Sequence, residues 1–172
     1  MTTTDPAAAW TVRRLLASDA TAYQRLRLEG FGRHPREFRI APEDEQALRP
    51  DAVADRLEGS FVAGAYGGDD LVGIAGFTRF DGAKLRHRAL LWGMYVRPTA
   101  RGGGVGDALM DCLLAQARAD GIEQMILTVA AENARARRLY ERWGFSVYGT
   151  EPRAIKLPDG YLDELLMQCP LA

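Results

Sequence analysis

The sequence predicts a mixed α/β (α+β) fold, with a central, mostly antiparallel mixed sheet flanked by helices. Short apolar runs bounded by turn residues, which are typical of strands, alternate with stretches of helical period. Three of these runs follow one another within residues 61–96 with only turns between them, as in an antiparallel meander. The 172 residues suit a single domain, 1–172, in which residues 1–8 are expected to form a flexible tail.

The first half of the chain predicts a strand and two helices ahead of the meander. Residues 10–16, WTVRRLL, alternate as in a strand, and the following Ser-Asp pair offers an N-cap for a helix through about Glu29. Residues 30–50 contain three prolines and no steady period, so we expect a loop or a loosely ordered lid. The other elements expected here are a helix after Pro50 through about Leu57 and strands at 61–66, 71–80 and 88–96.

The second half predicts two further helices that alternate with strands. Apolar residues recur at helical spacing from Gly104 to about Ala119, and Gly121 suits the position after that helix. Further on, the sequence predicts a buried strand at 124–129, a helix over 133–144 and strands at 145–149 and 161–168. The complete order is β-α-α-β-β-β-α-β-α-β-β, without repeats or a linker that would suggest a second domain.

Composition disfavours several classes of partner. The chain has 22 basic and 23 acidic residues and a net charge of −1, so it offers no broad field for nucleic acid or a membrane surface. Its two cysteines, Cys112 and Cys169, are too few and too far apart for a disulfide framework or a metal site, and no metal is expected. The N-terminus does not read as a secretory signal, and we expect a cytoplasmic protein.

Residues 101–110, RGGGVGDALM, are the first stretch that indicates chemistry. A buried apolar strand precedes these glycines and an amphipathic helix follows them, so the first amides of the helix are free to bind an anion. A nucleoside-triphosphate loop requires Gly-Lys-Ser/Thr, whereas Asp107 follows Gly106 here. A dinucleotide fingerprint requires a third glycine that is also missing, which leaves a glycine-rich turn or another kind of phosphate loop.

Residues 133–145, NARARRLYERWGF, are the second informative stretch. Asn133 is a good N-cap, the apolar residues up to Trp143 fall on one helix face, and Gly144 ends the helix. On spacing alone, a place in the core explains Tyr140 better than a catalytic role does.

Taken together, the two stretches resemble the GNAT family of N-acetyltransferases. The loop Arg101-x-x-Gly104-x-Gly106 fits that family's acetyl-coenzyme A pattern, Gln/Arg-x-x-Gly-x-Gly/Ala. The second stretch fits its Asn-x-x-Ala-x-x-Leu-Tyr-x-x-x-Gly-Phe pattern at the expected distance downstream. The element order is also similar over nearly the whole chain, and least so over the first fifty residues. The resemblance implies a GNAT-like domain that uses acetyl-CoA to acetylate a primary amine.

The resemblance also implies a cofactor site. The pyrophosphate would bind the backbone of the glycine loop, with Arg101 supplying charge or framing the loop, and the pantetheine arm would pair with the edge of the strand before it. A backbone N–H near Tyr95 would hold the oxyanion, and Tyr140 would protonate the thiolate leaving group. The residues implied in cofactor binding are Met94, Tyr95, Val96, Arg101, Gly102, Gly103, Gly104, Val105, Gly106, Asp107, Asn133 and Tyr140.

The general base and the acceptor are less well defined. Many members of this family carry a glutamate on the strand before the loop, but residues 89–96 contain no carboxylate. Glu29 is the first candidate base, because the first helix lines the acceptor side in this family. The other candidates are His34, Glu37, His87 and Glu132.

The expected acceptor is a small-molecule amine or a protein amino group. Phe31, Phe38, Trp92 and Tyr161 would form an aromatic wall, while Arg36, Arg39 and Arg153 could hold an acidic group of the acceptor. The cations of KLRHR, residues 84–88, are either a solvated strand end or a site for the ribose phosphate. We expect a monomer or a homodimer. Two alternatives stay open, a CoA-binding sensor without turnover and an acyltransferase for another acyl-CoA.

Overall fold

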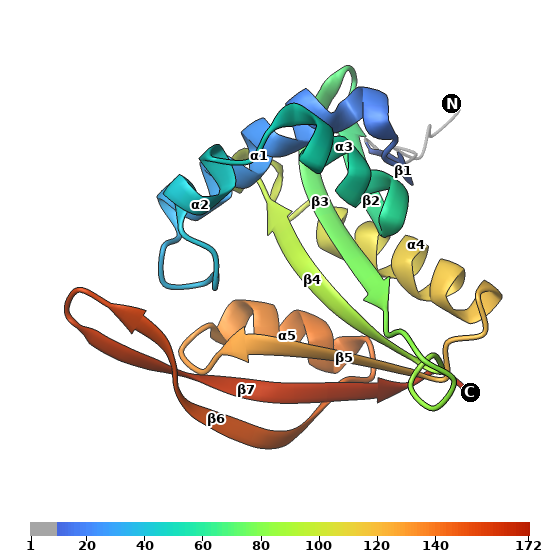
Figure 1. Ribbon diagram of the computed structural model, residues 1–172, viewed down its shortest axis with the longest axis vertical. Helices are drawn as coiled ribbons and strands as arrows, with labels where there is room; N and C mark the ends of the chain where they lie inside the picture. The colour runs from blue at the N-terminus through green and yellow to red at the C-terminus, as the bar shows by residue number, and fades with distance from the viewer. Residues whose placement is uncertain (1–9) are drawn as a thin grey trace, which may run out of the picture.

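A computed structural model describes residues 10–172, and the tail predicted at residues 1–8 lies outside them. The described chain forms a seven-stranded sheet in the order β1-β2-β3-β4-β5-β7-β6, with helices on both faces (Figure 1). The pair β4 and β5 is parallel and the other neighbouring strands are antiparallel. The predicted mixed α/β class is therefore confirmed.

The elements follow the chain in this order: β1 (Thr11–Arg14), η1 (Ala17–Asp19), α1 (Ala20–Arg33), α2 (Pro42–Gln46), α3 (Pro50–Gly59), β2 (Phe61–Gly67), β3 (Asp70–Arg79), β4 (Arg88–Val96), η2 (Pro98–Ala100), α4 (Val105–Ala119), β5 (Gln124–Ala130), α5 (Ala134–Arg142), β6 (Ser146–Leu157) and β7 (Gly160–Pro170).

The core is divided between the two faces of the sheet. On one face, α4 packs on β2 and β3 and buries Val105, Leu109 and Leu113 completely or nearly so. On the other face, α1 and α3 pack on the meander through a second apolar cluster that includes Tyr23 and Leu26. The predicted helices α1, α3 and α4 therefore present their apolar stripes to the sheet, as their spacing requires.

Three elements differ from the sequence-based prediction. Helix α1 continues to Arg33 instead of ending near Glu29, because Phe31 on its last turn is buried against Phe38, which offsets the low helix propensity of two nearby glycines. Part of the predicted loop at 30–50 folds as the short helix α2, started by a proline at its first position. Strand β6 continues beyond residue 149, because β7 pairs with it on both sides of an irregularity near Arg153.

The sheet opens where β4 and β5 separate. These two strands pair only from Arg88 to Leu90 on β4, and then diverge (Figure 1). On its other side, β4 carries a bulge, because Trp92 and Tyr95 pair with β3 residues that are only two apart. Gly93 within this bulge has φ +68°, a conformation that favours glycine. The second half of β4 is thus left without a strand partner toward β5.

Candidate active site

A cavity of about 360 Å³ lies where β4 leaves β5. Its walls come from the 34–41 segment, the second half of β4, the glycine loop, β5 and α5. The lining residues are Glu37, Phe38, Leu91, Trp92, Gly93, Met94, Tyr95, Val96, Arg101, Gly102, Gly104, Val105, Gly106, Asp107, Leu127, Thr128, Val129, Asn133, Arg135, Ala136, Leu139, Tyr140 and Arg142. The structure thus brings together both sequence stretches that indicated chemistry.

The glycine loop presents free amides to this cavity. Gly104 is the N-cap of α4 with φ +79°, and its carbonyl accepts the first helical hydrogen bond, from Ala108 N–H at 2.9 Å. The amides of the first helical residues, from Val105 to Asp107, therefore have no partner within the helix. Together with the positive end of the helix dipole, they form a site suited to a phosphate group.

Asp107 does not place an unpaired negative charge beside this site. Its carboxylate accepts a hydrogen bond from Trp143 Nε1 at 2.8 Å and from Arg142 Nη2 at 3.1 Å. The Asp107 side chain is 46% exposed, and it joins the start of α4 to the end of α5. Asn133 is likewise a structural cap, since its Oδ1 accepts from Ala136 N–H at 3.1 Å, although it also lines the cavity.

Arg101 frames the loop. Its Nε donates to the Val96 carbonyl at 2.9 Å, and its Nη2 lies 3.2 Å from His34 Nε2. Because a guanidinium can only donate, His34 Nε2 is the acceptor, and the ring carries its proton on Nδ1, which lies 3.6 Å from Glu37 Oε1. Burial lowers the pKa of His34, in agreement with a neutral ring.

Tyr140 lies on α5 with its side chain 6% exposed, packed against Phe145. Within residues 10–172 its hydroxyl makes no hydrogen bond, and the residue lines the cavity. Burial, and to a smaller extent the negative charge of Glu37, raises the pKa of Tyr140 well above its ordinary value. The hydroxyl therefore keeps its proton and is available to donate it.

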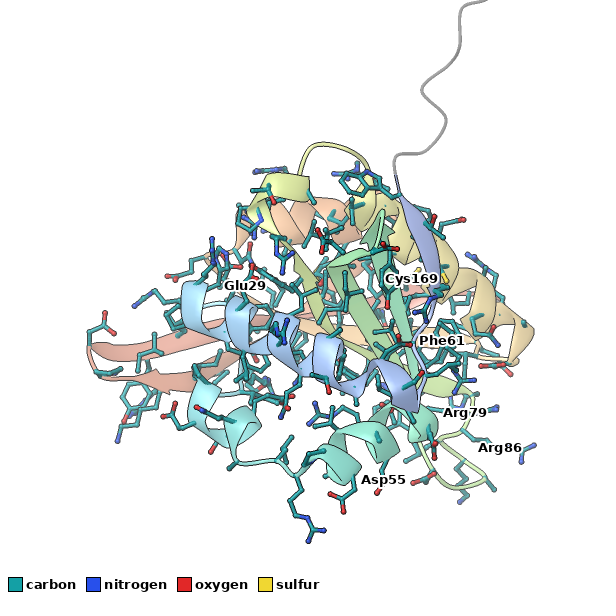
Figure 2. All side chains as sticks on the ribbon, turned by 90° about the horizontal axis from the view of Figure 1, so that it is seen from above. Glu29, Asp55, Phe61, Arg79, Arg86 and Cys169 are labelled. Atoms are coloured by element: carbon teal, nitrogen blue, oxygen red, sulfur yellow. The ribbon has the colours of Figure 1, made fainter. Side chains whose placement is uncertain are left out.

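Two of the glutamates considered as bases, Glu29 and Glu37, have different surroundings. Glu29 projects from the last part of α1 (Figure 2) and holds Arg97 at 2.9 Å and the Tyr95 hydroxyl at 3.1 Å. The Arg97 hydrogen bonds lower the pKa of Glu29, and this side chain does not line the cavity. Glu37 does line the cavity, close enough to Tyr140 to affect its pKa. Its contacts with His34 and Arg135, both at 3.6 Å, are too long for hydrogen bonds.

Other residues expected near the acceptor are engaged elsewhere. Arg36 pairs with Glu132 and Asp159, and Arg39 with Glu151 and Glu164, so the structure does not offer these arginines to an acidic substrate. Of the other residues expected at the acceptor, Trp92 and Phe38 line the cavity, whereas Phe31, Arg153 and Tyr161 do not. Arg153 stacks on Tyr161, 4.0 Å from the ring centroid, along the β6 and β7 hairpin.

The remaining candidates lie at the other end of β4. His87 directly precedes the strand, and its carbonyl accepts from Glu123 N–H at 2.7 Å. The cations of residues 84–88 belong to the same turn and start of β4, and none of them lines the cavity. Arg86 projects far from Glu29 (Figure 2). Because this turn lies outside the cavity lining, its cations are better explained as a solvated strand end than as a site for the ribose phosphate.

A charged cluster that was not expected from the sequence lies beside the cavity. Arg27 on α1 is 4% exposed and binds the Glu45 carboxylate of α2 through Nε at 3.0 Å and Nη2 at 3.1 Å. Arg56 of α3 binds the same carboxylate at 2.9 Å. The signal was a charged residue within the apolar stripe of the first helix, one position after the buried Leu26.

Comparison with known proteins agrees with this architecture. Residues 20–145 match the model of the Acetyltransferase (GNAT) family. Among solved structures, a GNAT-family acetyltransferase from Streptococcus pneumoniae superposes with a TM-score of 0.84 at 21% identity, over 94% of this chain and 99% of that one. The protein yncA of Salmonella typhimurium, solved with its cofactor acetyl-CoA, has a TM-score of 0.81 at 23% identity, over 95% of each chain.

Curated sequences give a similar result. The mycothiol acetyltransferase of Streptomyces scabiei is 32% identical over 142 residues, which are 82% of this chain and 44% of that protein. An L-methionine sulfoximine/L-methionine sulfone acetyltransferase of Pseudomonas paraeruginosa is 35% identical over 78 residues, 45% of each chain. This chain thus spans less than half the length of the mycothiol relative it matches. It belongs to the GNAT family of acetyltransferases, and the resemblance read from the two stretches is confirmed.

Two features are absent from residues 10–172. None of the helices in this part of the chain combines the length and apolar character needed to cross a membrane. In the same residues, no three His, Cys, Asp or Glu side chains are grouped so that they could hold a metal ion.

Proposed function

We propose that this chain moves the acetyl group of acetyl-CoA to a primary amine by direct attack within a ternary complex. The observation that carries the proposal is the cavity that joins the glycine loop to Tyr140 at the divergence of β4 and β5. A cofactor with an anionic head and an extended amide arm suits a helix N-terminus at one end and an unpaired strand edge at the other.

In this proposal the residues of the loop and of β4 hold the cofactor. The amides from Gly102 to Asp107 bind the pyrophosphate, and the edge of β4 at Met94, Tyr95 and Val96 pairs with the pantetheine arm. Arg135 and Arg142 line the same cavity and add positive charge near the phosphates. Asn133 lies beside the cofactor at the start of α5.

Tyr140 acts as the general acid. The amine nitrogen attacks the thioester carbonyl, a C–N bond forms, and the C–S bond breaks to release a thiolate. A backbone N–H near Tyr95 stabilises the oxyanion of the tetrahedral intermediate. The Tyr140 proton passes to the thiolate, since the hydroxyl is protonated at neutral pH before the reaction begins.

Glu37 is the better candidate for the proton acceptor. An alkyl ammonium has a pKa of about 10, so the acceptor must lose a proton before it attacks. Glu37 faces the cavity near Tyr140 and is free of close hydrogen bonds within the described residues, whereas Glu29 is held by Arg97. A carboxylate at Glu37 supplies the group that β4 lacks, which favours turnover over a sensor without activity.

The names of the curated relatives also bear on the acceptor. Mycothiol acetyltransferase and L-methionine sulfoximine/L-methionine sulfone acetyltransferase both refer to small molecules. We therefore prefer a small-molecule amine to a protein amino group as the acceptor of this chain.

Calorimetric titration with acetyl-CoA tests the cofactor site. The wild type is expected to bind, while Gly104→Glu places a side chain and a negative charge where the phosphates lie and abolishes binding. Gly68→Glu is the matched control, since Gly68 is exposed in the β2 to β3 turn with φ +62° and equally open space. Equal loss of binding in both variants, or no binding by the wild type, would contradict the proposal.

A further inference from the structure

One donor of the buried cluster is unused. Arg27 Nε and Nη2 bind Glu45, but within residues 10–172 its Nη1 makes no hydrogen bond. An added Cβ on Gly93 would lie 3.0 Å from this Nη1, so the atom sits directly over the β4 bulge. Arg27 is not among the residues that line the cavity, so its Nη1 lies next to the lining residue Gly93 and not in the cavity wall itself. Among the described residues, the Tyr23 hydroxyl is the fully enclosed side-chain polar atom without a partner, so Nη1 is not fully enclosed.

Gly93 lines the cavity, and it directly precedes the β4 segment Met94 to Val96 proposed to hold the pantetheine arm. Consecutive Cα atoms are about 3.8 Å apart, so a group that reaches Gly93 lies within a few ångströms of the thioester end of that arm. The Arg27 guanidinium is held in place by aromatic rings, 4.8 Å from the Phe31 centroid and 5.8 Å from that of Trp92. The unused donor is therefore rigidly positioned beside the expected place of the acceptor.

The cluster also contains more positive than negative charge. Two guanidinium groups, those of Arg27 and Arg56, face one carboxylate, Glu45, so the cluster carries a surplus positive charge. Glu45 is 1% exposed and the Arg27 side chain 4%, whereas Arg56 is 23% exposed and reaches solvent, so the buried charge that a ligand could balance is that of Arg27. Burying an unbalanced charge is costly, and a ligand anion at Nη1 would reduce that cost.

We propose that Arg27 Nη1 donates a hydrogen bond to a carboxylate of the acceptor. The substrate is then a compact amino acid whose amine is acetylated. This inference rests on the proposed function and names the substrate class. An α-amino acid separates its amine and carboxylate by a single carbon, which suits a carboxylate donor beside Gly93 and a reacting centre near Tyr95, two residues further along β4. Trp92 and Phe38, which line the same cavity, suit an apolar side chain of the acceptor.

Matched pairs of substrates test the proposal. CoA release is measured with L-leucine and 3-methylbutylamine, and with L-phenylalanine and 2-phenylethylamine, for the wild type, Arg27→Lys and Arg49→Lys. A lysine at 27 keeps a cation against Glu45 but removes Nη1. The two members of a pair differ in basicity, but this difference is the same for each enzyme and cancels when the ratios of kcat/KM are compared.

The wild type is expected to prefer the amino acid of each pair. In Arg27→Lys the ratio of kcat/KM for acid over amine should fall about 10- to 100-fold, the effect of losing a hydrogen bond to a charged group. Arg49, which is 82% exposed and pairs with Asp51, provides a control whose ratio should not change. A purely structural role of Arg27 would lower both rates together and leave the ratio unchanged, and this result would overturn the proposal.

A second measurement does not depend on a variant that folds. 3-Phenylpropanoate and 3-phenylpropanol share a ring and differ in the carboxylate, and each is tested as a competitor of the amine with the wild type. Stronger competition by the carboxylate supports the inference, while equal competition contradicts it. Acetylation of the simple amines without preference for amino acids would overturn this inference alone, whereas failure to bind acetyl-CoA would overturn the proposed function and this inference with it.

Discussion

The two candidate bases, Glu29 and Glu37, make opposite predictions when each is changed to glutamine. Glu29 holds Arg97 and the Tyr95 hydroxyl at 2.9 to 3.2 Å, in a setting where the Glu29 side chain is 21% exposed. Hydrogen bonds to charged groups contribute about 1.5 to 3 kcal/mol when well formed, so Glu29→Gln should destabilise the fold by roughly 1 to 3 kcal/mol. The Glu29 carboxylate lies outside the cavity lining, and turnover should persist.

Glu37 is expected to behave in the reverse way. Its contacts with the neutral His34 and with Arg135, both 3.6 Å long, involve partially exposed side chains, so Glu37→Gln should change stability by less than about 1 kcal/mol. Loss of a general base typically lowers the rate about 10² to 10⁴-fold, which corresponds to roughly 3 to 5 kcal/mol of transition-state free energy.

Urea unfolding and CoA release at pH 7 measure the two effects on the same protein samples. The expected result is a crossed pattern, with stability lost in Glu29→Gln and activity lost in Glu37→Gln. A loss of activity above 100-fold in Glu29→Gln with near-normal activity in Glu37→Gln would refute our assignment and return the role of base to Glu29. Because both substitutions replace a carboxylate by an amide of equal size, each serves as the control of the other.

Two further predictions concern stability. Glu45→Gln leaves the buried Arg27 and the partly exposed Arg56 without their counter-charge, and should cost about 3 to 5 kcal/mol in urea unfolding. The exposed Asp51→Asn should cost less than about 0.5 kcal/mol, and similar losses in both variants would contradict the role of the cluster. Hydrogen bonds from Arg13 lower the pKa of Asp19 to about 2, below its ordinary value, so this carboxylate stabilises the fold above about pH 4 and less as the pH falls toward 2. The stability difference between wild type and Asp19→Asn should therefore shrink between pH 5 and 2, and a constant difference would refute this.

Local patterns predicted the elements that are determined by local chemistry. The glycine loop, the Asn133 cap and the apolar faces of α4 and α5 follow from residue spacing, and the structure has them at the predicted positions. The extra turn of α1 and the long β6 depend on tertiary packing, in which a buried Phe31 and pairing with β7 override weak local preference. Sequence reasoning has no access to such partners.

The acceptor side was predicted less well for the same reason. Nothing in the spacing of Arg36 and Arg39 shows that each is neutralised by two carboxylates from distant parts of the chain. The sequence does not distinguish Glu29 from Glu37 as a base. In the structure, Glu29 is held by Arg97, whereas Glu37 lines the cavity. Pairings that span a hundred residues require the fold.

The central claim is that the split between β4 and β5 is a working acetyl-transfer site with Tyr140 as its acid. The most direct test compares Tyr140→Phe with Tyr148→Phe, a control at an exposed tyrosine of β6. Calorimetry measures the binding of acetyl-CoA to each variant, and CoA release in the presence of an amine measures its activity. We predict that both variants bind acetyl-CoA as the wild type does, and that CoA release falls about 10² to 10⁴-fold in Tyr140→Phe alone. Undiminished CoA release by Tyr140→Phe would contradict the claim.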